Sequence, residues 1–412
     1  MTRAVVATGL GAVGPWGVGV EALAGCLAQG GTRPVVVDRS AGYHAPGGAR
    51  TALTASGLDL SALVPPASAR RMSPPARFAV AALRLALADA GLANADHERT
   101  GIVVGTAFGP AFVTEQLLIQ LLRQGPEAAS PAAFTESVAS ASAAQMAMAV
   151  GARGPNLAIT QRETSDLAAL AEGARLVATG AAERVLVAAV DEMIPLLHAV
   201  LDRFRTLARP GADGAEVARP FDRRRDGFLA AEGAAVVVLE AEPDALGRGA
   251  RPLARLAGVV RGFDASAPAW DWGTGSGPLA ATRARGLRRA GVAPGSIDLV
   301  VSGASGARRG DRLEAGVLTT LFGQRLPAVV APKGTVGEPG GAHLAAALLA
   351  ASGRAIGPTR GFEEPDPELG LRPSVAEKLP APRRTLVSAL ASGGAATWVV
   401  LDAPEPSPAR AV

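Results

Sequence analysis

Apolar residues along this chain alternate between short continuous runs and longer stretches with helical spacing. The short runs predict buried strands, and the stretches in which apolar residues recur every three or four positions predict amphipathic helices. In the first half, strands are predicted at 5–8, 101–105, 157–160, 184–190 and 234–239, and helices at 20–28, 73–92, 112–123 and 166–180. A glycine-rich turn is expected directly after the first strand, and residues 191–208 are expected to be irregular or to form a short helix.

The same alternation restarts in the second half. Strands are predicted at 252–260, 299–302, 328–331, 385–390 and 396–401, and helices at 277–290, 311–322 and 341–351. The Pro- and Glu-rich stretch 353–382 is expected to be a surface loop, and the tail after residue 402 to be frayed. Strands that alternate with helices predict an α/β fold with parallel sheets covered on both faces. Two series of similar length suggest a pseudo-repeat with halves at 1–240 and 241–412.

Charge and cysteine usage exclude several classes of function. The net charge is only +4 and the arginines are scattered along the chain, which argues against a nucleic-acid partner. Every apolar stretch of about twenty residues is broken by glycine, proline or charge, so we expect no membrane partner. The glycine-interrupted N-terminus does not resemble a signal peptide. The single Cys26 allows no disulfide within the chain, and we interpret it as a buried, unreactive thiol of a cytoplasmic protein.

The sequence shows no pattern typical of a metal or cofactor site. The histidines are widely separated and have no metal-ligand spacing: His44, His97, His198 and His343. The glycine cluster 9–14 resembles a dinucleotide fingerprint only loosely, because no acidic ribose partner ends a second strand at the expected distance. We therefore expect neither a metal ion nor a cofactor.

The stretch 154–180 predicts a strand that turns abruptly into a helix. Gly154-Pro155 precede an apolar run, a polar turn at 161–165 follows, and an Ala/Leu-rich helix ends at Gly180. Enzymes use such elbows to present a nucleophile at a helix N-terminus, where free backbone N–H groups favour negative charge. The tip of this elbow carries Glu163.

These residues resemble the nucleophile elbow of the β-ketoacyl synthases, condensing enzymes of the thiolase superfamily. Their pattern is Gly-Pro, four or five residues, and Thr-Ala-Cys-x-Ser-Gly. Gly154-Pro155 and Ser165 match this pattern, and Glu163 stands where the family has its acylated cysteine. The string 219–240 closely resembles a second family motif, R-P-F-D-x-x-R-D-G-F-x-x-x-E-G-A, which leads into a predicted strand. The resemblance covers nearly the whole chain and implies a thiolase-like, five-layer α-β-α-β-α fold built from two pseudo-repeated halves.

The resemblance locates the family's other catalytic positions, and this chain departs at each of them. Gly303 replaces the first catalytic histidine, and Glu338 replaces the second. Ser392 replaces the phenylalanine that gates the pocket, although the adjacent Gly393-Gly394 pair is kept. Condensation requires a thiolate that holds the acyl chain and imidazoles that activate the malonyl thioester. Because all three groups are missing, we predict no catalytic residue, although the family's Asp311, Glu314 and Lys333 are retained.

This combination is similar to the chain-length factor, or ketosynthase-β, of type II polyketide synthases of bacterial secondary metabolism. In that family a ketosynthase-like subunit without the cysteine forms a heterodimer with an active ketosynthase. Members of that family often have glutamine at the position where this chain has Glu163. The resemblance implies an active ketosynthase subunit as partner and an acyl carrier protein reached through the complex.

In such a subunit the side chains at the interface limit the length of the growing chain. The segment 131–142 matches the family segment that crosses towards the other protomer. By analogy, the expected substrate-binding residues lie on the helix 112–123 and on this crossing segment: Phe112, Val113, Gln116, Leu117, Gln120, Phe134 and Val138.

Two alternatives remain open. The first is a malonyl-acyl-carrier-protein decarboxylase that makes primer units, although its histidines would be expected to persist. The second is an enzyme of the same fold that uses Glu163 or Glu338 as an acid or base. Arg70, Arg71 and Arg77 precede or enter a predicted helix, where they either contact an acidic carrier protein or form a solvated helix face.

Overall fold

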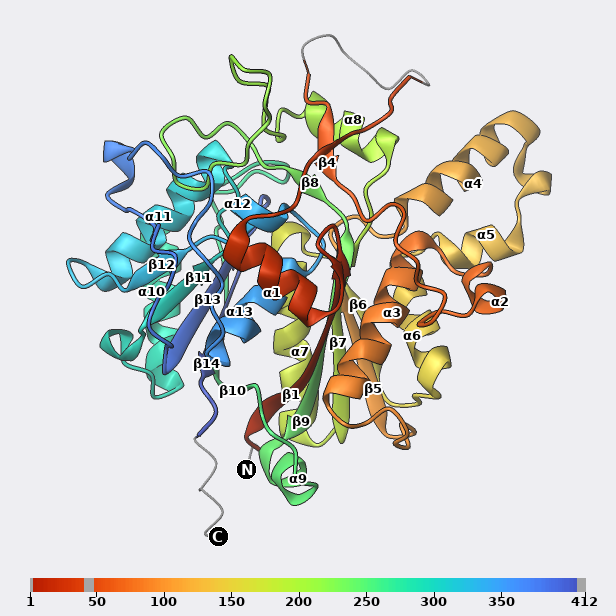
Figure 1. Ribbon diagram of the computed structural model, residues 1–412, viewed down its shortest axis with the longest axis horizontal. Coiled ribbons are helices and arrows are strands. Elements are labelled where there is room, and N and C mark those ends of the chain that lie inside the picture. Colours follow the sequence, from red (N-terminus) through yellow and green to blue (C-terminus); the bar gives the residue numbers. More distant parts are fainter. Residues whose placement is uncertain (1–2, 41–47, 406–412) are drawn as a thin grey trace.

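The fold is a stack of five layers in which two mixed β-sheet regions alternate with helices, in a computed structural model that describes residues 3–40 and 48–405 (Figure 1). The main strands are β1 (Val5–Gly14), β2 (Gly17–Val18), β5 (Thr100–Gly105), β6 (Asn156–Ile159), β7 (Arg184–Asp191), β9 (Gly233–Ala241), β10 (Ala254–Phe263), β11 (Leu299–Ser302), β12 (Ala328–Val330), β13 (Arg384–Leu390) and β14 (Ala395–Asp402). A separate small sheet is formed by β3 (Val35–Val36), β4 (Thr51–Leu53) and β8 (Ala230–Ala231).

The helices cover the sheets on both faces and also fill the space between them. They are α1 (Val20–Gln29), α2 (Pro66–Ala69), α3 (Pro74–Asp89), α4 (Ala111–Gln124), α5 (Pro131–Glu136), α6 (Ala141–Val150), α7 (Ser165–Thr179), α8 (Pro195–Arg203), α9 (Glu242–Gly247), α10 (Ser276–Arg289), α11 (Arg308–Phe322), α12 (Lys333–Val336) and α13 (Ala342–Ala351). Short 3-10 turns occur at η1 (Pro126–Ala128), η2 (Arg162–Thr164), η3 (Pro294–Ser296) and η4 (Pro367–Leu369).

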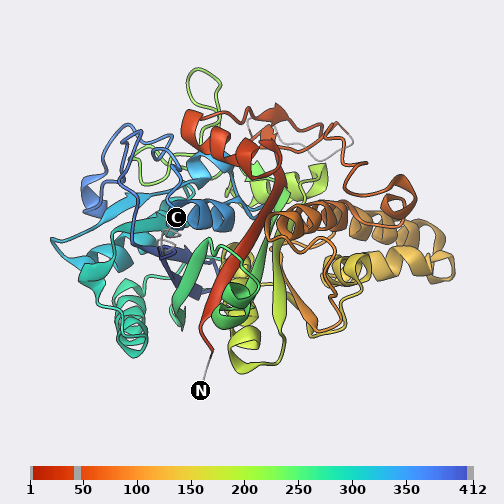
Figure 2. The same cartoon turned by 60° about the horizontal axis from the view of Figure 1, so that its bottom comes forward.

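The two halves repeat the same strand order. The first half reads β6-β5-β7-β9-β1 and the second reads β12-β11-β13-β14-β10, and β1 pairs briefly with β10 to join them. Figure 2 shows β1 running through the middle of the molecule, with the second half to one side and the rest of the first half to the other. The prediction of purely parallel sheets was wrong. In each half three strands are parallel, but β9 and β1 in the first half, and β14 and β10 in the second, run antiparallel to their neighbours.

Alternate residues of the strands belong to different layers of the core. Val237 and Leu239 of β9 pack with α7, α13 and α1 in the central layer, whereas Val236 and Val238 pack under α3 and α6 on the outer face. On the far side, α10 and α11 cover β11, β13 and β14. The N-terminal ends of α7 and α13 therefore meet at the centre of the molecule, between the two sheet regions, and this junction positions the candidate site.

The predicted glycine-rich turn after the first strand is wrong, because β1 continues to Gly14. Its glycines allow α3 to lie directly on the strand. A Cβ on Gly9 would come within 2.4 Å of Ala86 O, and one on Gly11 within 2.1 Å of Ala82 O. Close packing of the helix on the strand, rather than a change of chain direction, explains this cluster.

The stretch 353–382 has little regular structure, but it is not simply a surface loop. Ile356, Thr359 and Leu371 are buried, and Thr359 Oγ1 accepts a hydrogen bond from Ala331 N at 3.0 Å.

Cys26 is half-buried rather than fully buried, and burial raises the pKa of its thiol. His44 and the last seven residues of the tail lie outside the described residues.

Candidate functional site

The predicted strand-turn-helix is present, and Ser165 links it by a hydrogen bond to Thr106, the residue that follows β5. β6 ends at Ile159 and α7 begins at Ser165. Ser165 Oγ accepts a hydrogen bond from Gln161 N at 2.8 Å and lies 3.0 Å from Thr106 O and 2.7 Å from Arg162 O. Arg162 adopts a left-handed backbone conformation, with φ 51°, which is uncommon for a residue with a side chain. The turn places Glu163 at its tip.

The carboxylate of Glu163 binds the C-terminal turn at Ser392. Ser392 N donates to Glu163 Oε2 at 3.1 Å, and Ser392 Oγ lies 3.0 Å from Oε1 and 3.1 Å from Oε2. Arg162 Nη1 in turn donates to Ser392 Oγ at 3.1 Å. Burial and the negative charge of Glu338 raise the pKa of Glu163 to about 7, against the lowering effects of these hydrogen bonds and of Lys333. The two substituted positions, elbow tip and gate, therefore contact one another.

The backbone N–H groups of the C-terminal turn all have partners within the protein. Ser392 N donates to Glu163, Gly393 N donates to Asp271 O at 2.9 Å, and Gly394 N donates to Ala391 O at 3.1 Å. Both glycines have positive φ, 83° and 97°, so the turn keeps the backbone shape that the sequence suggested. An oxyanion hole requires N–H groups that point at the developing charge. Here the N–H of Ser392 already donates its hydrogen bond to the carboxylate of Glu163.

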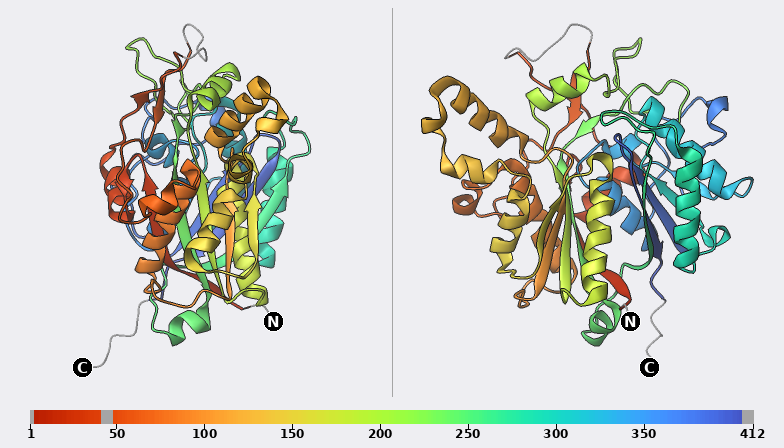
Figure 3. Two further views of the ribbon diagram at one scale, coloured as in Figure 1. Left: turned by 90° about the vertical axis from the view of Figure 1, so that its right-hand side faces the viewer. Right: turned by 180° about the vertical axis from the view of Figure 1, so that it is seen from behind.

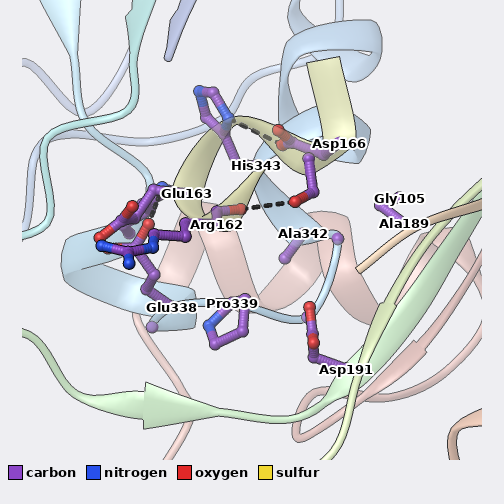
Figure 4. Close-up of a pocket in the computed structure, with 15 residues that line it drawn as sticks. Gly105, Arg162, Glu163, Asp166, Ala189, Asp191, Glu338, Pro339, Ala342 and His343 are labelled. Atoms are coloured by element: carbon purple, nitrogen blue, oxygen red, sulfur yellow. Dashed lines mark hydrogen bonds and ion pairs between the residues drawn. The ribbon is translucent and has the colours of Figure 1, made fainter. Parts of the chain in front are cut away.

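Glu338, a substituted position, and Lys333, a retained one, form a buried ion pair beside the elbow. Lys333 Nζ binds Glu338 Oε1, and both side chains are almost fully buried. Burial disfavours the charge of Lys333, but attraction to Glu338 and Asp166 outweighs it and raises the pKa of Lys333. Figure 4 shows Glu163, Arg162 and Glu338 close together at one end of the pocket. The ammonium group therefore sits among three carboxylates.

A second buried pair, which sequence reasoning missed, links the two halves. His343 Nδ1 lies 3.2 Å from Asp166 Oδ2, so α13 and α7 are joined at their first turns (Figure 4). Burial raises the pKa of Asp166, but the hydrogen bond and charge of His343 outweigh it, so the pKa is lowered overall. Asp166 stands where the family pattern has glycine, and this departure was the available signal.

Asp191 was also missed. It ends β7 and lines the same pocket, where its carboxylate accepts hydrogen bonds from Thr106 Oγ1 at 2.8 Å and from the backbone N–H groups of Ala107 and Phe108 at 3.0 and 2.9 Å. Burial raises the pKa of Asp191 to about 7. Nothing in its local sequence distinguishes it from an ordinary residue at a strand end.

The retained acidic residues hold backbone rather than a reacting group. Asp311 accepts hydrogen bonds from Phe221 N at 2.8 Å and from Ser305 N at 3.1 Å, and burial raises the pKa of Asp311 to about 7. Glu314 accepts from Ser302 Oγ at 3.1 Å. Both residues therefore shape the loop after β11, which contains Gly303.

The pocket among these residues is small. Its cavity volume is about 30 Å³, enclosed by Glu163, Asp166, Asp191, Lys333 and the segment 337–343. A cavity needs about 10–15 Å³ on this measure to hold one water molecule, so the space suits one or two water molecules and not an acyl chain.

The residues expected to limit chain length lie elsewhere, on α4, on α5 and just after α5. Phe112 and Val113 line a cleft of about 600 Å³ together with Ala132 and Ala133 of the crossing segment. Leu117 is buried in the packing of α4, and Gln120 Oε1 accepts a hydrogen bond from Ser130 N at 3.3 Å. The others point to solvent: Gln116, Phe134 and Val138. Of the seven residues expected to limit chain length, Phe112 and Val113 line this cleft and the other five do not. The structure therefore does not bring the expected group into one cavity.

No group of three or more histidine, cysteine, aspartate or glutamate residues suited to a metal ion occurs in the described part of the chain. Within the same residues, no helix is long and apolar enough to cross a membrane.

The backbone at position 303 leaves no space for the histidine that the family has there. A Cβ on Gly303 would lie 2.8 Å from Ser388 O. We therefore expect Gly303→His and Gly303→Ala each to lower the free energy of unfolding by about 1–3 kcal/mol, measured by urea unfolding. Gly277→Ala in α10 is the control, because nothing lies within 4 Å of a Cβ there. Unchanged stability of both variants at position 303 would show that this backbone yields easily.

The layered fold and an elbow between its halves define a protein of the thiolase-like condensing-enzyme class. The chain belongs to the β-ketoacyl synthase family. The N-terminal domain of that family matches residues 2–245, and its C-terminal domain matches residues 275–363.

Several known proteins are similar over most of their length. The tetracenomycin polyketide synthase ketoacyl synthase alpha subunit of Streptomyces glaucescens is 32% identical, over 91% of this chain and 92% of that protein. Putative polyketide beta-ketoacyl synthase 2 of Streptomyces halstedii is 32% identical, over 84% and 83%. The solved structure of the ishigamide ketosynthase/chain length factor is 27% identical and superimposes with a TM-score of 0.84, over 98% of this chain and 99% of that chain.

Proposed function

We propose that this chain is a ketosynthase-like subunit without condensing activity of its own. It pairs with an active ketosynthase in a type II polyketide synthase and helps to set the length of the polyketide. The observation that carries the proposal is the carboxylate of Glu163, which stands at the nucleophile position and takes the N–H of Ser392. A carboxylate forms no thioester, and the 30 Å³ cavity beside it has no room for an acyl chain.

The surface around β6 supports a protein partner. β6 is the last strand of the sheet order in the described residues, so its outer edge has no neighbouring strand. α4 and α5 project from the same half of the molecule (Figure 3). Large apolar side chains are exposed there, including Leu122 at 86% and Phe134 at 61%. Exposed apolar side chains next to an open sheet edge are typical of an interface.

The similar proteins support the choice of partner. The relatives named above include a ketoacyl synthase alpha subunit of a polyketide synthase, and the similar structure is a ketosynthase with a chain length factor. Another structure of the same fold shows a type II acyl-carrier protein in complex with its ketosynthase bound to the hexaketide. We propose the same kind of assembly for this chain, with the acyl carrier protein reached through the complex.

Co-expression with an active type II ketosynthase and its acyl carrier protein tests the proposal. We expect a one-to-one heterodimer by native mass spectrometry, and product formation that Glu163→Ala retains. We expect Val113→Trp, which adds bulk inside the 600 Å³ cleft, to shorten the product, and Phe112→Ala to lengthen it, measured by mass spectrometry of the released polyketide. Leu246→Ala, an exposed apolar residue on the distant α9, is the control. Product loss with Glu163→Ala in an intact complex contradicts the proposal.

One observation favours a second candidate, an enzyme that uses Glu163 as an acid or base. The pKa of Glu163, raised to about 7, matches the value that general catalysis near neutral pH requires. The isolated chain would then turn over an acyl-carrier thioester, and Glu163→Gln would abolish that turnover. The first proposal expects no turnover by the isolated chain, with or without the substitution.

A further inference from the structure

Arg283 of α10 is a completely buried cation in the core of the second half, where α10 and α11 lie side by side (Figure 1). Its Cζ lies 5.8 Å from the ring centre of Phe322 and 5.5 Å from that of Trp398, so the guanidinium group contacts two aromatic rings. Burial lowers the pKa of Arg283 to about 10, and the side chain therefore remains charged at neutral pH. Nη2 donates to Val317 O at 2.7 Å, but Nε and Nη1 have no hydrogen-bond partner in the part of the chain that the structure describes. A buried donor without a partner is costly, so these two nitrogens indicate a further polar contact.

Glu314 of α11 carries the opposite charge. Burial raises the pKa of Glu314, and the positive charge of Arg283 partly opposes this effect. Oε1 of Glu314 accepts a hydrogen bond from Ser302 Oγ at 3.1 Å, whereas Oε2 is buried and has no partner among the described residues. Arg283 and Glu314 therefore attract each other without a direct hydrogen bond between them.

The sheet beneath this pair adds two more polar atoms of the same kind. Ser302, Ser388 and Trp398 stand opposite one another on β11, β13 and β14, so their side chains share the sheet face that α10 and α11 cover. The hydroxyl of Ser388 also opposes the effect of burial on the pKa of Glu314, so it lies near that carboxyl. Ser388 Oγ and Trp398 Nε1 are both buried without a hydrogen-bond partner in the described residues. Together with Nε and Nη1 of Arg283 they make four unpaired donor atoms beside one unpaired acceptor, Oε2 of Glu314.

We infer that ordered water binds in this cluster and bridges the guanidinium group of Arg283 to the carboxyl group of Glu314. A buried water molecule usually makes about three hydrogen bonds to polar groups that otherwise lack partners, so the unpaired atoms suit roughly one or two water molecules. Water both donates and accepts, and it therefore matches a set of donors that faces a carboxylate oxygen. A halide ion would accept from the donors but would be repelled by ionised Glu314.

The water bridge extends the hydrogen bonds of Glu314, which reach Ser302 at the end of β11, to Arg283 on α10. It gives a physical reason why an apolar core tolerates both charges, because each is hydrogen-bonded to water and compensated by the other. The inference does not depend on the proposed function, since it concerns only polar atoms inside the second half.

A high-resolution crystal structure of the full chain tests the site directly. We expect density for water within hydrogen-bonding distance of Oε2 of Glu314 and of at least one nitrogen of Arg283. Crystals soaked in sodium bromide distinguish water from an anion, because bromide gives an anomalous signal. Anomalous density in the cluster, or a direct hydrogen bond between Arg283 and Glu314 with no water beside it, overturns the inference.

The indole N–H of Trp398 provides a second readout in solution. In protein that carries isotope-labelled tryptophan, we expect a nuclear Overhauser effect between this proton and long-lived water. The signal is assigned by elimination with Trp16→Phe, Trp270→Phe and Trp272→Phe. Ser388→Ala removes one hydrogen-bonding group and leaves both charges in place, and it is expected to weaken the effect. Arg283→Met combined with Glu314→Met, an apolar pair of similar volume, is expected to abolish it.

Thr385→Val is the matched control. Thr385 lies on the same strand as Ser388, and its hydroxyl is also buried without a partner in the described residues. It faces the opposite side of the sheet, because an odd number of positions separates the two residues. The control is expected to leave the effect unchanged. An effect that is missing in the wild-type chain overturns the inference, as does one that persists unchanged in both Ser388→Ala and the double variant, or one that disappears in Thr385→Val.

Discussion

Replacing Lys333 with methionine is expected to lower the free energy of unfolding by about 3–5 kcal/mol, because removal of one partner leaves a buried charge without compensation. Lys333 is the cation that faces Glu338, Glu163 and Asp166, and burial has already removed most of the solvent that would otherwise stabilise these carboxylates. Urea unfolding at pH 7 measures the loss. The pKa of Glu163 is expected to rise further in this variant, because Lys333 lowers it in the wild type.

Two further variants separate the loss of charge from the loss of packing. Lys333→Met combined with Glu338→Met is expected to recover most of the stability, because an apolar pair of similar volume often equals or exceeds a buried ion pair. Arg354→Met is the control for a surface pair. Its partner Glu21 has an 85% exposed side chain, and such pairs contribute about 0–1 kcal/mol. If Lys333→Met and Arg354→Met lose equal amounts, the buried pair does not stabilise the site.

Replacing Asp166 with alanine is expected to destabilise the protein by about 2–4 kcal/mol at pH 7, because the variant removes a buried, hydrogen-bonded charge that joins α7 to α13. The interaction lowers the pKa of Asp166 below its ordinary value of 3.8. A lowered carboxyl pKa contributes stability that is fully present above the unfolded-state pKa and is lost as the pH falls towards the folded-state pKa. The difference between wild type and variant is therefore expected to shrink below about pH 4.

Unfolding in urea at pH 3 to pH 8 measures this difference. Asp166→Asn keeps the shape and one hydrogen-bonding group but not the charge, and its stability is expected to lie between those of the wild type and Asp166→Ala. The double variant Asp166→Ala with His343→Ala is expected to lose less than the sum of the two single variants, because the two residues share one interaction. Strict additivity would contradict a direct link between the halves.

The local elements were predictable because each has a strong local signal. The apolar run that ends at Phe322 became α11, and the run 299–302 became β11 with the same bounds. The direction of the strands was not predictable, because a strand that pairs antiparallel with its neighbour shows the same apolar run as one that pairs parallel. Gly9 and Gly11 suggested a turn because glycine is frequent in turns, although they are the points where α3 rests on β1.

At the site, substituted positions were easier to predict than their new partners. Comparison with the family pattern identified Glu163, Glu338 and Ser392 separately. The contact between Glu163 and Ser392 spans 229 positions, and that between Asp166 and His343 spans 177. Neither pair has a periodicity or spacing that would connect its members. The expected group on α4, on α5 and just after α5 shows the reverse problem, since analogy with the family grouped Leu117 with Phe112 and the structure buries only Leu117.

The sequence by itself predicted the alternating strands and helices and the elbow and, through its resemblance to the β-ketoacyl synthases, the layered fold and the positions Glu163, Gly303 and Glu338 where that family has a thiol and two imidazoles. These conclusions depend on residue identity and short-range pattern, which the chain carries in full. Only the tertiary structure decided what the replacements do instead, namely that Glu163 binds the turn, Lys333 neutralises Glu338 and Asp166 joins the halves. The physical reason is that buried charges are stable only beside partners, and the packing of the two halves determines which partners are near.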